Sequence, residues 1–299
     1  MISRFENSLP AGVRFMLLSA LGFSLMTACV KLLSNQNIPV MEIVAARALV
    51  SLLLSYIDVK RKGISIWGNN KPLLVGRGVA GALALMCVYY AVSTLPLAEA
   101  TLLQYLHPVF TAFLALLFLK EHIQKSTLAC IIFSLCGLVL MVQPDALFGG
   151  ESLLPIFSVG IALAGAFGSA VAYVIVRKLS SQKEDSSVII FYFPLIALPL
   201  SLLLLGDDFV VPNMETLFIM VLVGIFTQMG QIGLTRAMST ESAGKATAFS
   251  YVQVLFSVLL GWIIFSEVPT LWTWVGGSLI MAGALVNVYG SMRAKAESR

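Results

Sequence analysis

Charged residues are scarce in this chain, and that scarcity excludes a whole class of proteins. Of the 299 residues, 11% are charged and 59% are hydrophobic, with a mean hydropathy of +0.93. Soluble domains carry roughly 25% charged residues. The composition therefore excludes a soluble globular protein and predicts an all-α integral membrane protein whose surroundings are the lipid bilayer.

The motifs of enzymes and of nucleotide-driven pumps are absent as well. The chain contains no GxxxxGK[ST] loop, no HExxH, no GxSxG and no paired intramembrane aspartates. Its four cysteines fall inside apolar runs without metal-ligand spacing, which is typical of packing residues. We expect no enzyme activity, no cofactor and no metal site, and we attribute the net charge of +4 to the loops rather than to nucleic-acid binding.

Long uncharged runs dominate what is present. Eight of them contain 19 to 25 residues, close to the ~20 that cross a bilayer as a helix. They cover residues 78–98, 100–119, 126–144, 152–176, 186–206, 216–235, 246–266 and 268–292. Residues 15–30 form a shorter run, and residues 40–57 are apolar but include Glu42 and Arg47. The sequence therefore predicts ten transmembrane helices.

The chain repeats itself at an offset of 146 residues. Residues 91–142 align with residues 237–288 without a gap and with 12 of 52 positions identical, including Tyr105/Tyr251 and Glu121/Glu267. Five spans per copy is an odd number, so the second copy must enter the membrane from the opposite side. We predict two inverted five-helix repeats, residues 1–146 and 147–299.

The basic residues predict the orientation of the chain. If both termini are cytoplasmic, 17 of the 19 Lys and Arg residues, Arg77 among them, fall on the cytoplasmic side, and only Lys31 and Arg47 do not. Cytoplasmic loops are enriched in Lys and Arg. We therefore expect a multi-pass protein of the plasma (inner) membrane with both termini in the cytoplasm.

Small residues indicate where helices approach closely. On the sixth span they recur every fourth position, at Gly160, Ala164, Gly168 and Ala172, a pattern that lets another helix pack against that face. Glycines 276, 277 and 283 of the last span indicate either helix packing or contact with a second copy. The sequence thus leaves a monomer and a homodimer open.

A substrate site is expected near the membrane midplane, where the inverted repeats meet. The midpoints of the fourth and ninth spans lie beside the repeat partners His107 and Gln253, although a lone His can also be a core residue. Pro108 lacks an N–H and predicts a kink there, serving either a cavity or packing alone. The residues predicted to bind substrate are Arg47, Gln104, His107, Gln228, Gln231, Tyr251 and Gln253.

Charged side chains within the spans have two readings each. Arg47 either binds an anionic group of the substrate or fixes its helix to a distant partner, because Glu42 lies five residues away and about 140° around the helix. Glu42 and Glu99 are candidates for coupling or gating, and equally for helix capping. Gln228 and Gln231 either line a cavity or bond a neighbouring helix.

Two further acids occupy equivalent positions at the ends of the fourth and ninth spans. Glu121 and Glu267 precede the next span in each repeat, where a carboxylate stabilises a helix N-terminus. We expect each of them to cap the helix that follows it.

The segment from Tyr89 to Val142 resembles the EamA-type repeat of the drug/metabolite transporter superfamily. The resemblance rests on Leu95-Pro96, Ala100, the mid-helix Pro108, Glu121 and the late Gly137, and it extends through both copies. It implies a ten-helix secondary transporter of small molecules without an ATP-binding part. The second copy has Val254 in place of Pro108 and Phe193 in place of Arg47, so the halves are expected to differ in function.

These observations predict a carrier that exports amino acids, other metabolites or drugs by alternating access. A proton is the most economical coupling ion, because an unperturbed histidine such as His107 titrates near neutrality. The alternative is an importer or exchanger of a charged metabolite, such as a nucleotide-like or sulfonium compound. A channel or a scaffold lacks a recognisable filter sequence but stays open on composition.

Overall fold

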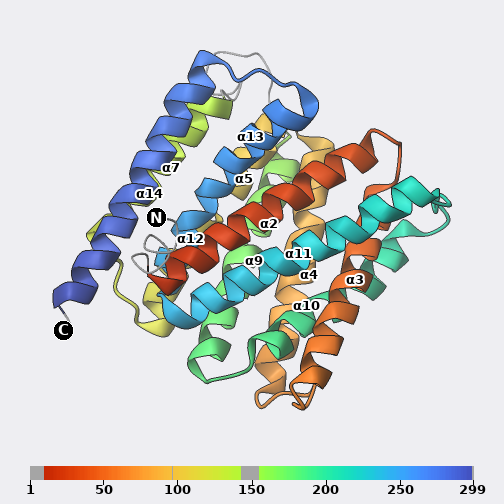
Figure 1. Cartoon of the computed structure of the whole chain (residues 1–299), viewed down its shortest axis with the longest axis horizontal. Helices are drawn as coiled ribbons and strands as arrows, with labels where there is room; N and C mark the ends of the chain where they lie inside the picture. Colours follow the sequence, from red (N-terminus) through yellow and green to blue (C-terminus); the bar gives the residue numbers. More distant parts are fainter. Residues whose placement is uncertain (1–9, 96, 143–154, 298–299) are drawn as a thin grey trace, which may run out of the picture.

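The chain folds entirely into helices in the residues that its computed structural model describes, which are 10–95, 97–142 and 155–297 (Figure 1). Ten helices in these ranges are long and apolar enough to cross a membrane. The prediction of an all-α protein with ten spans is confirmed. The predicted boundary between the repeats, at residues 146–147, lies outside the described residues.

Each repeat contributes four continuous spans and one broken span. The first contains α2 (Ala11–Ser34), α3 (Val40–Arg61), α4 (Lys71–Thr94), a broken span of α5 (Leu97–Gln104), α6 (His107–Leu114) and the π-helix η1 (Ala115–Leu119), and then α7 (Lys125–Val142). The second contains α9 (Ile156–Ser181), α10 (Ser186–Leu205), α11 (Met214–Thr240), a broken span of α12 (Ala243–Ala248), the 3₁₀ turn η2 (Phe249–Tyr251) and α13 (Val252–Phe265), and then α14 (Leu271–Glu297).

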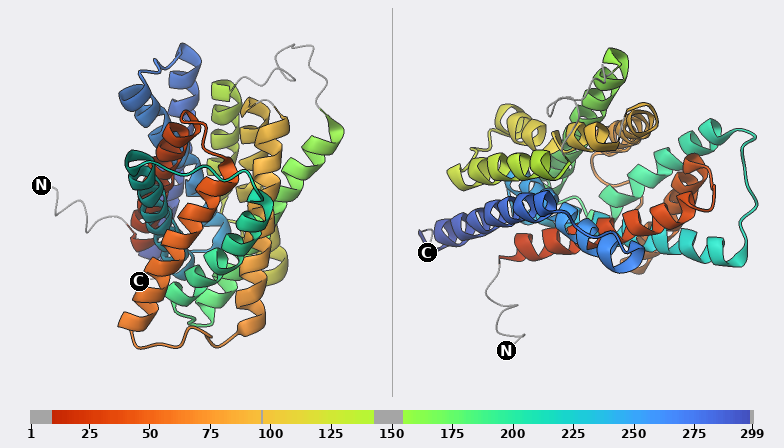
Figure 2. Two further views of the ribbon diagram at one scale, coloured as in Figure 1. Left: turned by 90° about the vertical axis from the view of Figure 1, so that its right-hand side faces the viewer. Right: turned by 90° about the horizontal axis from the view of Figure 1, so that it is seen from above.

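The first described helix begins on the side of the molecule where the last one ends. The start of α2 and the end of α14 are found there (Figure 2, right), as ten alternating spans require. We call this side the termini end and the opposite side the far end.

The third span begins earlier than the charge pattern predicts. Asn70 caps α4, because its side chain accepts a hydrogen bond from the Leu73 N–H at 3.3 Å, and Pro72 occupies the first turn. The helix therefore starts at Lys71 and includes Arg77, which the charge count assigned to a loop. That assignment is wrong, since Arg77 is buried nearly two turns inside the helix.

The same helix pairs form twice, as an inverted repeat requires. Helix α2 packs along α11, as Figure 1 shows, and its repeat equivalent α9 packs along α4. A Cβ added to Gly22 would lie 2.7 Å from the Gly230 nitrogen, and one added to Gly168 would lie 3.1 Å from the Ala84 Cβ. Gly230 and Ala84 are themselves 146 residues apart, so one close contact is built at both sites.

Backbone geometry repeats as closely as the packing does. Four non-glycine residues in the described part of the chain have positive φ: Asn37 at 59°, Lys183 at 61°, Lys120 at 55° and Ser266 at 56°. They form two pairs at the repeat offset. Such left-handed residues are uncommon, so their recurrence shows that the duplication extends to the backbone of the helix ends.

The predicted stripe of small residues is on the right helix but partly on the wrong face. Gly160 and Ala164 are exposed, and nothing lies within 4 Å of a Cβ added to Gly160. Gly165 and Gly168 face α4 instead, and a Cβ on Gly165 would lie 3.0 Å from the Cys87 Cβ. Spacing alone identifies a stripe of small residues, but the neighbouring helix decides which stripe is used.

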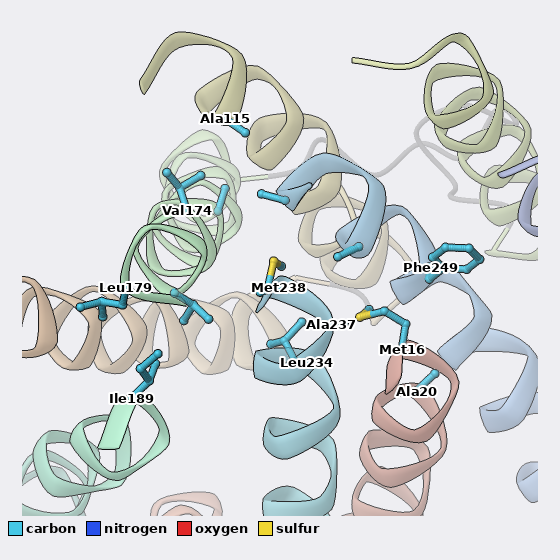
Figure 3. Close-up of a cluster of buried hydrophobic side chains, with 14 of the residues drawn as sticks. Met16, Ala20, Ala115, Val174, Leu179, Ile189, Leu234, Ala237, Met238 and Phe249 are labelled. Atoms are coloured by element: carbon cyan, nitrogen blue, oxygen red, sulfur yellow. The ribbon is translucent and has the colours of Figure 1, made fainter. Parts of the chain in front are cut away.

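The two ends of the bundle are packed differently. At the termini end, buried apolar residues of nine spans form one cluster, part of which is drawn in Figure 3, including Met16, Leu179, Ile189, Met238 and Phe249. At the far end the buried apolar residues separate into two smaller clusters, one from α2, α3 and α11 and one from α4, α5 and α9. The core therefore joins the repeats at the termini end and leaves them less connected at the far end.

Replacing Gly276 with Ala should destabilise the fold. Its added Cβ would lie 2.3 Å from the Gly137 carbonyl oxygen, so α7 and α14 would have to separate, at a cost of about 1–3 kcal/mol. Gly160→Ala is the matched control, since that position is open and Ala favours a helix by up to about 1 kcal/mol. Thermal unfolding in detergent should show a lower melting temperature for Gly276→Ala only. Equal melting temperatures for the two variants would contradict the close packing of α7 and α14.

Candidate substrate site

The fourth span breaks at the position that Pro108 predicts. The Leu106 N–H bonds back only to Leu103, and the Val109 N–H bonds to Leu106 rather than to Tyr105. Pro108 has no N–H to offer Gln104. The carbonyls of Gln104 and Tyr105 thus lose their helical donors, and α5 ends at Gln104.

A tyrosine from the other repeat supplies one missing donor. The Tyr251 hydroxyl donates to the Tyr105 carbonyl at 2.9 Å, and the two rings stack with centroids 5.7 Å apart. Because these tyrosines are repeat partners, the pseudo-two-fold axis passes between them. The ninth span is also irregular here, as η2, although Val254 stands where the first repeat has Pro108.

A row of aromatic and cationic side chains extends from this point. The His107 ring lies 6.2 Å from the Tyr105 ring and 5.3 Å from the Tyr173 ring, measured between centroids. Tyr173 lies on α9, which packs along α4, the helix that carries Arg77. The Arg77 and Arg47 guanidinium carbons lie 5.0 and 6.0 Å from the centre of the Phe193 ring. We call these residues the central row, and they are Tyr251, Tyr105, His107, Tyr173, Arg77, Phe193 and Arg47.

Three of the six buried side-chain polar atoms that lack a partner within the described residues lie in or beside the central row. The Arg77 Nε, the Gln104 Oε1 and the His107 Nδ1 have no hydrogen-bond partner within the described residues. Native proteins leave few such atoms. These three are therefore the groups in the interior most available to a bound molecule.

The structure brings some of the predicted residues together and separates others. Arg47, His107 and Tyr251 belong to the central row, Gln104 lies at the break, and Gln231 accepts a hydrogen bond from Arg77 at 3.3 Å. Gln228 instead bonds Ser51 and Ser55 at 2.6 and 2.9 Å, which joins α11 to α3.

Three predicted residues have other surroundings. Gln253 provides its backbone carbonyl to the Ser24 hydroxyl at 2.9 Å. Glu42 sits at the start of α3, at the far end, where its carboxylate accepts from the Val210 N–H at 3.0 Å. Glu99 lies in the first turn of α5, and its side chain is outside the described residues.

Four members of the central row were not in the substrate-binding set predicted from sequence: Tyr105, Arg77, Tyr173 and Phe193. Phe193 carried a usable signal, since it is the repeat partner of Arg47. Arg77 directly precedes an uncharged run, so its sequence position did not separate a loop from a helix. Tyr173 lies in a long apolar span among similar residues, and nothing in its spacing marks it.

Repeat-equivalent ion pairs sit at the two ends of the bundle. At the termini end Arg177 bonds Glu121 at 2.6 Å, and at the far end Lys31 bonds Glu267. Glu121 also accepts from the Ala243 N–H at 2.8 Å, so it caps α12 and not the following helix α7, which corrects that prediction. The side chains of the termini-end pair are 22% and 17% exposed, against 45% and 56% at the far end.

A second contact of the termini end has no counterpart in sequence. Lys62 bonds Asp185 at 3.1 Å, whereas the equivalent positions hold Asp208 and Pro39. Burial of Asp185 acts to raise its pKa, but hydrogen bonds from Ser187 and Lys62 outweigh it and hold the pKa below the ordinary value. The pair is therefore charged at neutral pH and adds to the closure of this end.

One hollow in the described residues is lined by no residue of the central row. It is a hydrophobic groove of about 450 Å³ between α13 and α14, lined by Leu255, Trp262, Trp274 and Met281 among others. These residues are apolar, and the groove opens at the surface that lipid tails would cover. Its lining includes Thr273 and Ser278 but no charged residue.

Comparison with known families assigns the chain. The sequence model of the EamA-like transporter family matches residues 10–143 and, a second time, residues 156–289. The chain belongs to the EamA-like transporter family. Both matches coincide with the two repeats, and membership makes the chain a membrane transporter and not an enzyme.

Relatives within this family carry transporter names. The chain is 33% identical to the pseudopaline exporter CntI of Pseudomonas aeruginosa, over 93% of this chain and 95% of that protein. It is 32% identical to human solute carrier family 35 member G1, over 92% of this chain and 78% of that protein. A solved crystal structure at 20% identity, with a TM-score of 0.78 over 93% of this chain and 98% of that one, has the same fold.

Tyr251→Phe should destabilise the break in the fourth span. The variant leaves the Tyr105 carbonyl buried without a donor, which costs about 1–3 kcal/mol. Tyr105→Phe is the matched control, because within the described residues the Tyr105 hydroxyl makes no hydrogen bond. Unfolding measurements in detergent should give Tyr251→Phe a clearly lower stability than Tyr105→Phe. Equal losses of stability in the two variants would argue against the hydrogen bond to the Tyr105 carbonyl.

Proposed function

We propose that this chain is a proton-coupled secondary transporter that exports a small metabolite, such as an amino acid or a drug, by alternating access. One observation supports the proposal above the others: the two repeats meet at broken helices beside buried polar atoms that lack partners. Substrate sites of inverted-repeat transporters lie at such breaks near the midplane. The name of the relative CntI supports export as the direction.

The proposed site consists of the predicted residues together with those the structure adds. Five of the residues predicted from sequence belong to the site: Arg47, Gln104, His107, Gln231 and Tyr251. Arg77, Tyr173 and Phe193 join them. We assign Gln228 to helix packing, because both ends of its amide are bonded to α3.

The two ion pairs supply a physical basis for alternation. An inverted repeat gives each end an equivalent closing contact, so a rocking motion that breaks one can form the other more fully. Here the termini-end pair is partly buried and supported by the Arg177 bond to the Met238 carbonyl at 2.7 Å, while the far-end pair is exposed. We assign this conformation to the state open toward the far end, which is the outside if both termini are cytoplasmic.

His107 is the proposed proton carrier in this scheme. It is buried in the central row, and its Nδ1 has no partner within the described residues. A proton bound there would add a positive charge inside the row. Glu42 and Glu99 are the alternatives, and both occupy helix starts at the far end.

Flux into proteoliposomes tests both the transport and its coupling. Purified protein should accelerate the entry of at least one metabolite from a panel of amino acids and drugs, with a rate that saturates and that rises when a pH gradient is imposed. His107→Gln should keep substrate exchange and lose the response to the gradient. Rates that ignore the gradient in the unaltered protein would remove proton coupling, and a rate that never saturates would indicate a channel.

Charge exchange tests the far-end ion pair. Lys31→Glu and Glu267→Lys should each lower transport several-fold, because like charges replace an attraction that helps to close that end. The double variant should restore transport, since it rebuilds the pair with the charges exchanged. Lys60→Glu, at an exposed position on α3 with no ion pair in the described structure, is the control. A double variant as impaired as the single ones would refute the closing role.

A second candidate function is import or exchange of a charged metabolite, and the buried Arg47 and Arg77 support a charged substrate in either direction. Counterflow separates exchange from export. Vesicles preloaded with unlabelled substrate take up labelled substrate faster than empty ones if exchange is the main activity.

A further inference from the structure

Two arginine side chains lie inside the bundle without a carboxylate partner. Arg77 is 3% exposed and Arg47 is 7% exposed. Neither takes part in any of the ion pairs of the described residues. A guanidinium stays charged in proteins, and a charge within a transmembrane span requires a partner or water.

The groups that do contact these arginines are neutral. Both guanidinium carbons lie within 6.0 Å of the centre of the Phe193 ring. Arg47 also donates to the Met26 sulfur at 3.6 Å, a weak acceptor, and Arg77 donates to the Gln231 amide oxygen at 3.3 Å. The Arg77 Nε donates to nothing within the described residues. Two like charges are thus gathered around one ring, which an anion between them would stabilise.

The buried acids that the structure describes lie near the ends of the bundle, and the Glu42 Oε1 has no partner among the described residues. Glu42 accepts from the Val210 N–H at the far end, and Glu184 accepts from the Asn69 N–H at 2.8 Å at the termini end. Both carboxylates are engaged near the ends of the bundle, away from the ring that the two arginines share. The described side chains therefore leave the central row with a net positive charge.

We infer that the central row binds a metabolite bearing a carboxylate or phosphate, held between Arg47 and Arg77. This inference rests on the proposed transport function and adds the sign of the substrate's charge. The planar guanidinium is suited to either anion, because it offers parallel N–H donors. The unpartnered amide oxygen of Gln104, at the break in the fourth span, adds a requirement for an N–H or O–H donor on the same substrate. Amino acids, hydroxy acids and sugar phosphates satisfy both requirements, and simple cations such as sulfonium compounds satisfy neither.

Sorting substrates by charge tests this inference on the unaltered protein. A uniformly ¹³C-labelled metabolite extract of bacterial cells is divided on a strong anion exchanger at about pH 12, where carboxylates and phosphates are ionised and amino groups are neutral. Proteoliposomes with and without the full chain are then incubated with the retained fraction or the flow-through. Mass spectrometry identifies the compounds that enter, and their formulas separate carboxylates from phosphate esters.

Matched arginine variants locate the anion. Arg77→Gln and Arg47→Gln should each lower uptake of the retained compounds by roughly tenfold or more, since each removes a charge-assisted bond. Arg77→Lys keeps the charge and should retain part of the uptake. Arg236→Gln is the control, because Arg236 also lies over a ring, 5.7 Å from the centre of Phe15, but is exposed at the end of α11.

Each outcome decides between the two proposals. Uptake confined to the retained fraction, and lost in both Gln variants, would support the anion site. Uptake confined to the flow-through would overturn the anion site and leave the transport proposal standing. Uptake unchanged in Arg77→Gln and Arg47→Gln would overturn it too, and no uptake from either fraction would remove transport and the anion site together.

Discussion

Every backbone polar group inside a bilayer must find its partner within the protein, and this constraint shapes the whole molecule. It explains why the described residues form only helices and short turns. It also makes a broken span expensive unless another group replaces the lost hydrogen bond. In this chain Tyr251 replaces it, from the opposite repeat, with its hydroxyl on the Tyr105 carbonyl. The break, and the polar row beside it, depend on that contact across the pseudo-two-fold axis.

The duplication supplies pairs of equivalent contacts, and the differences within each pair carry the functional meaning. Gln182 with Asn70 and Gln36 with Thr216 bridge equivalent loops at opposite ends, at 3.1 and 2.7 Å. The ion pairs and the apolar clusters at the two ends differ from each other, because the termini end is packed more extensively than the far end. A symmetric scaffold in an asymmetric state is what alternating access requires, since the same contacts can form at either end.

Sequence predicted the large-scale architecture well, because hydrophobic length and charge placement are the dominant forces on a chain in a bilayer. The ten spans and the inverted repeat follow from them, and the break in the fourth span follows from the missing N–H of Pro108. Helix ends were less predictable. Asn70 caps α4, so the helix starts at Lys71 and includes Arg77, whereas the charge pattern placed Arg77 in a loop.

The site itself was only partly predictable, because it depends on which helices face one another. Gln228 and Gln231 are three residues apart and look equivalent, yet one bonds α3 and the other bonds Arg77 on α4. Glu121 precedes α7 in sequence but caps α12, since the chain folds back to bring Ala243 closer. The ninth span has no proline at its irregular turn, so the sequence did not predict that turn. Each of these facts is a tertiary contact that local pattern does not encode.

The most direct measurement of the alternating motion compares distances at the two ends of the same molecule. Spin labels at the exposed positions Asn35 and Ser93 report on the far end, and labels at their repeat equivalents Ser181 and Ser239 report on the termini end. Distances are measured in lipid vesicles before and after addition of the transported metabolite fraction. The account predicts that one distance shortens as the other lengthens. Two distances that stay constant, or that change in the same direction, would contradict it.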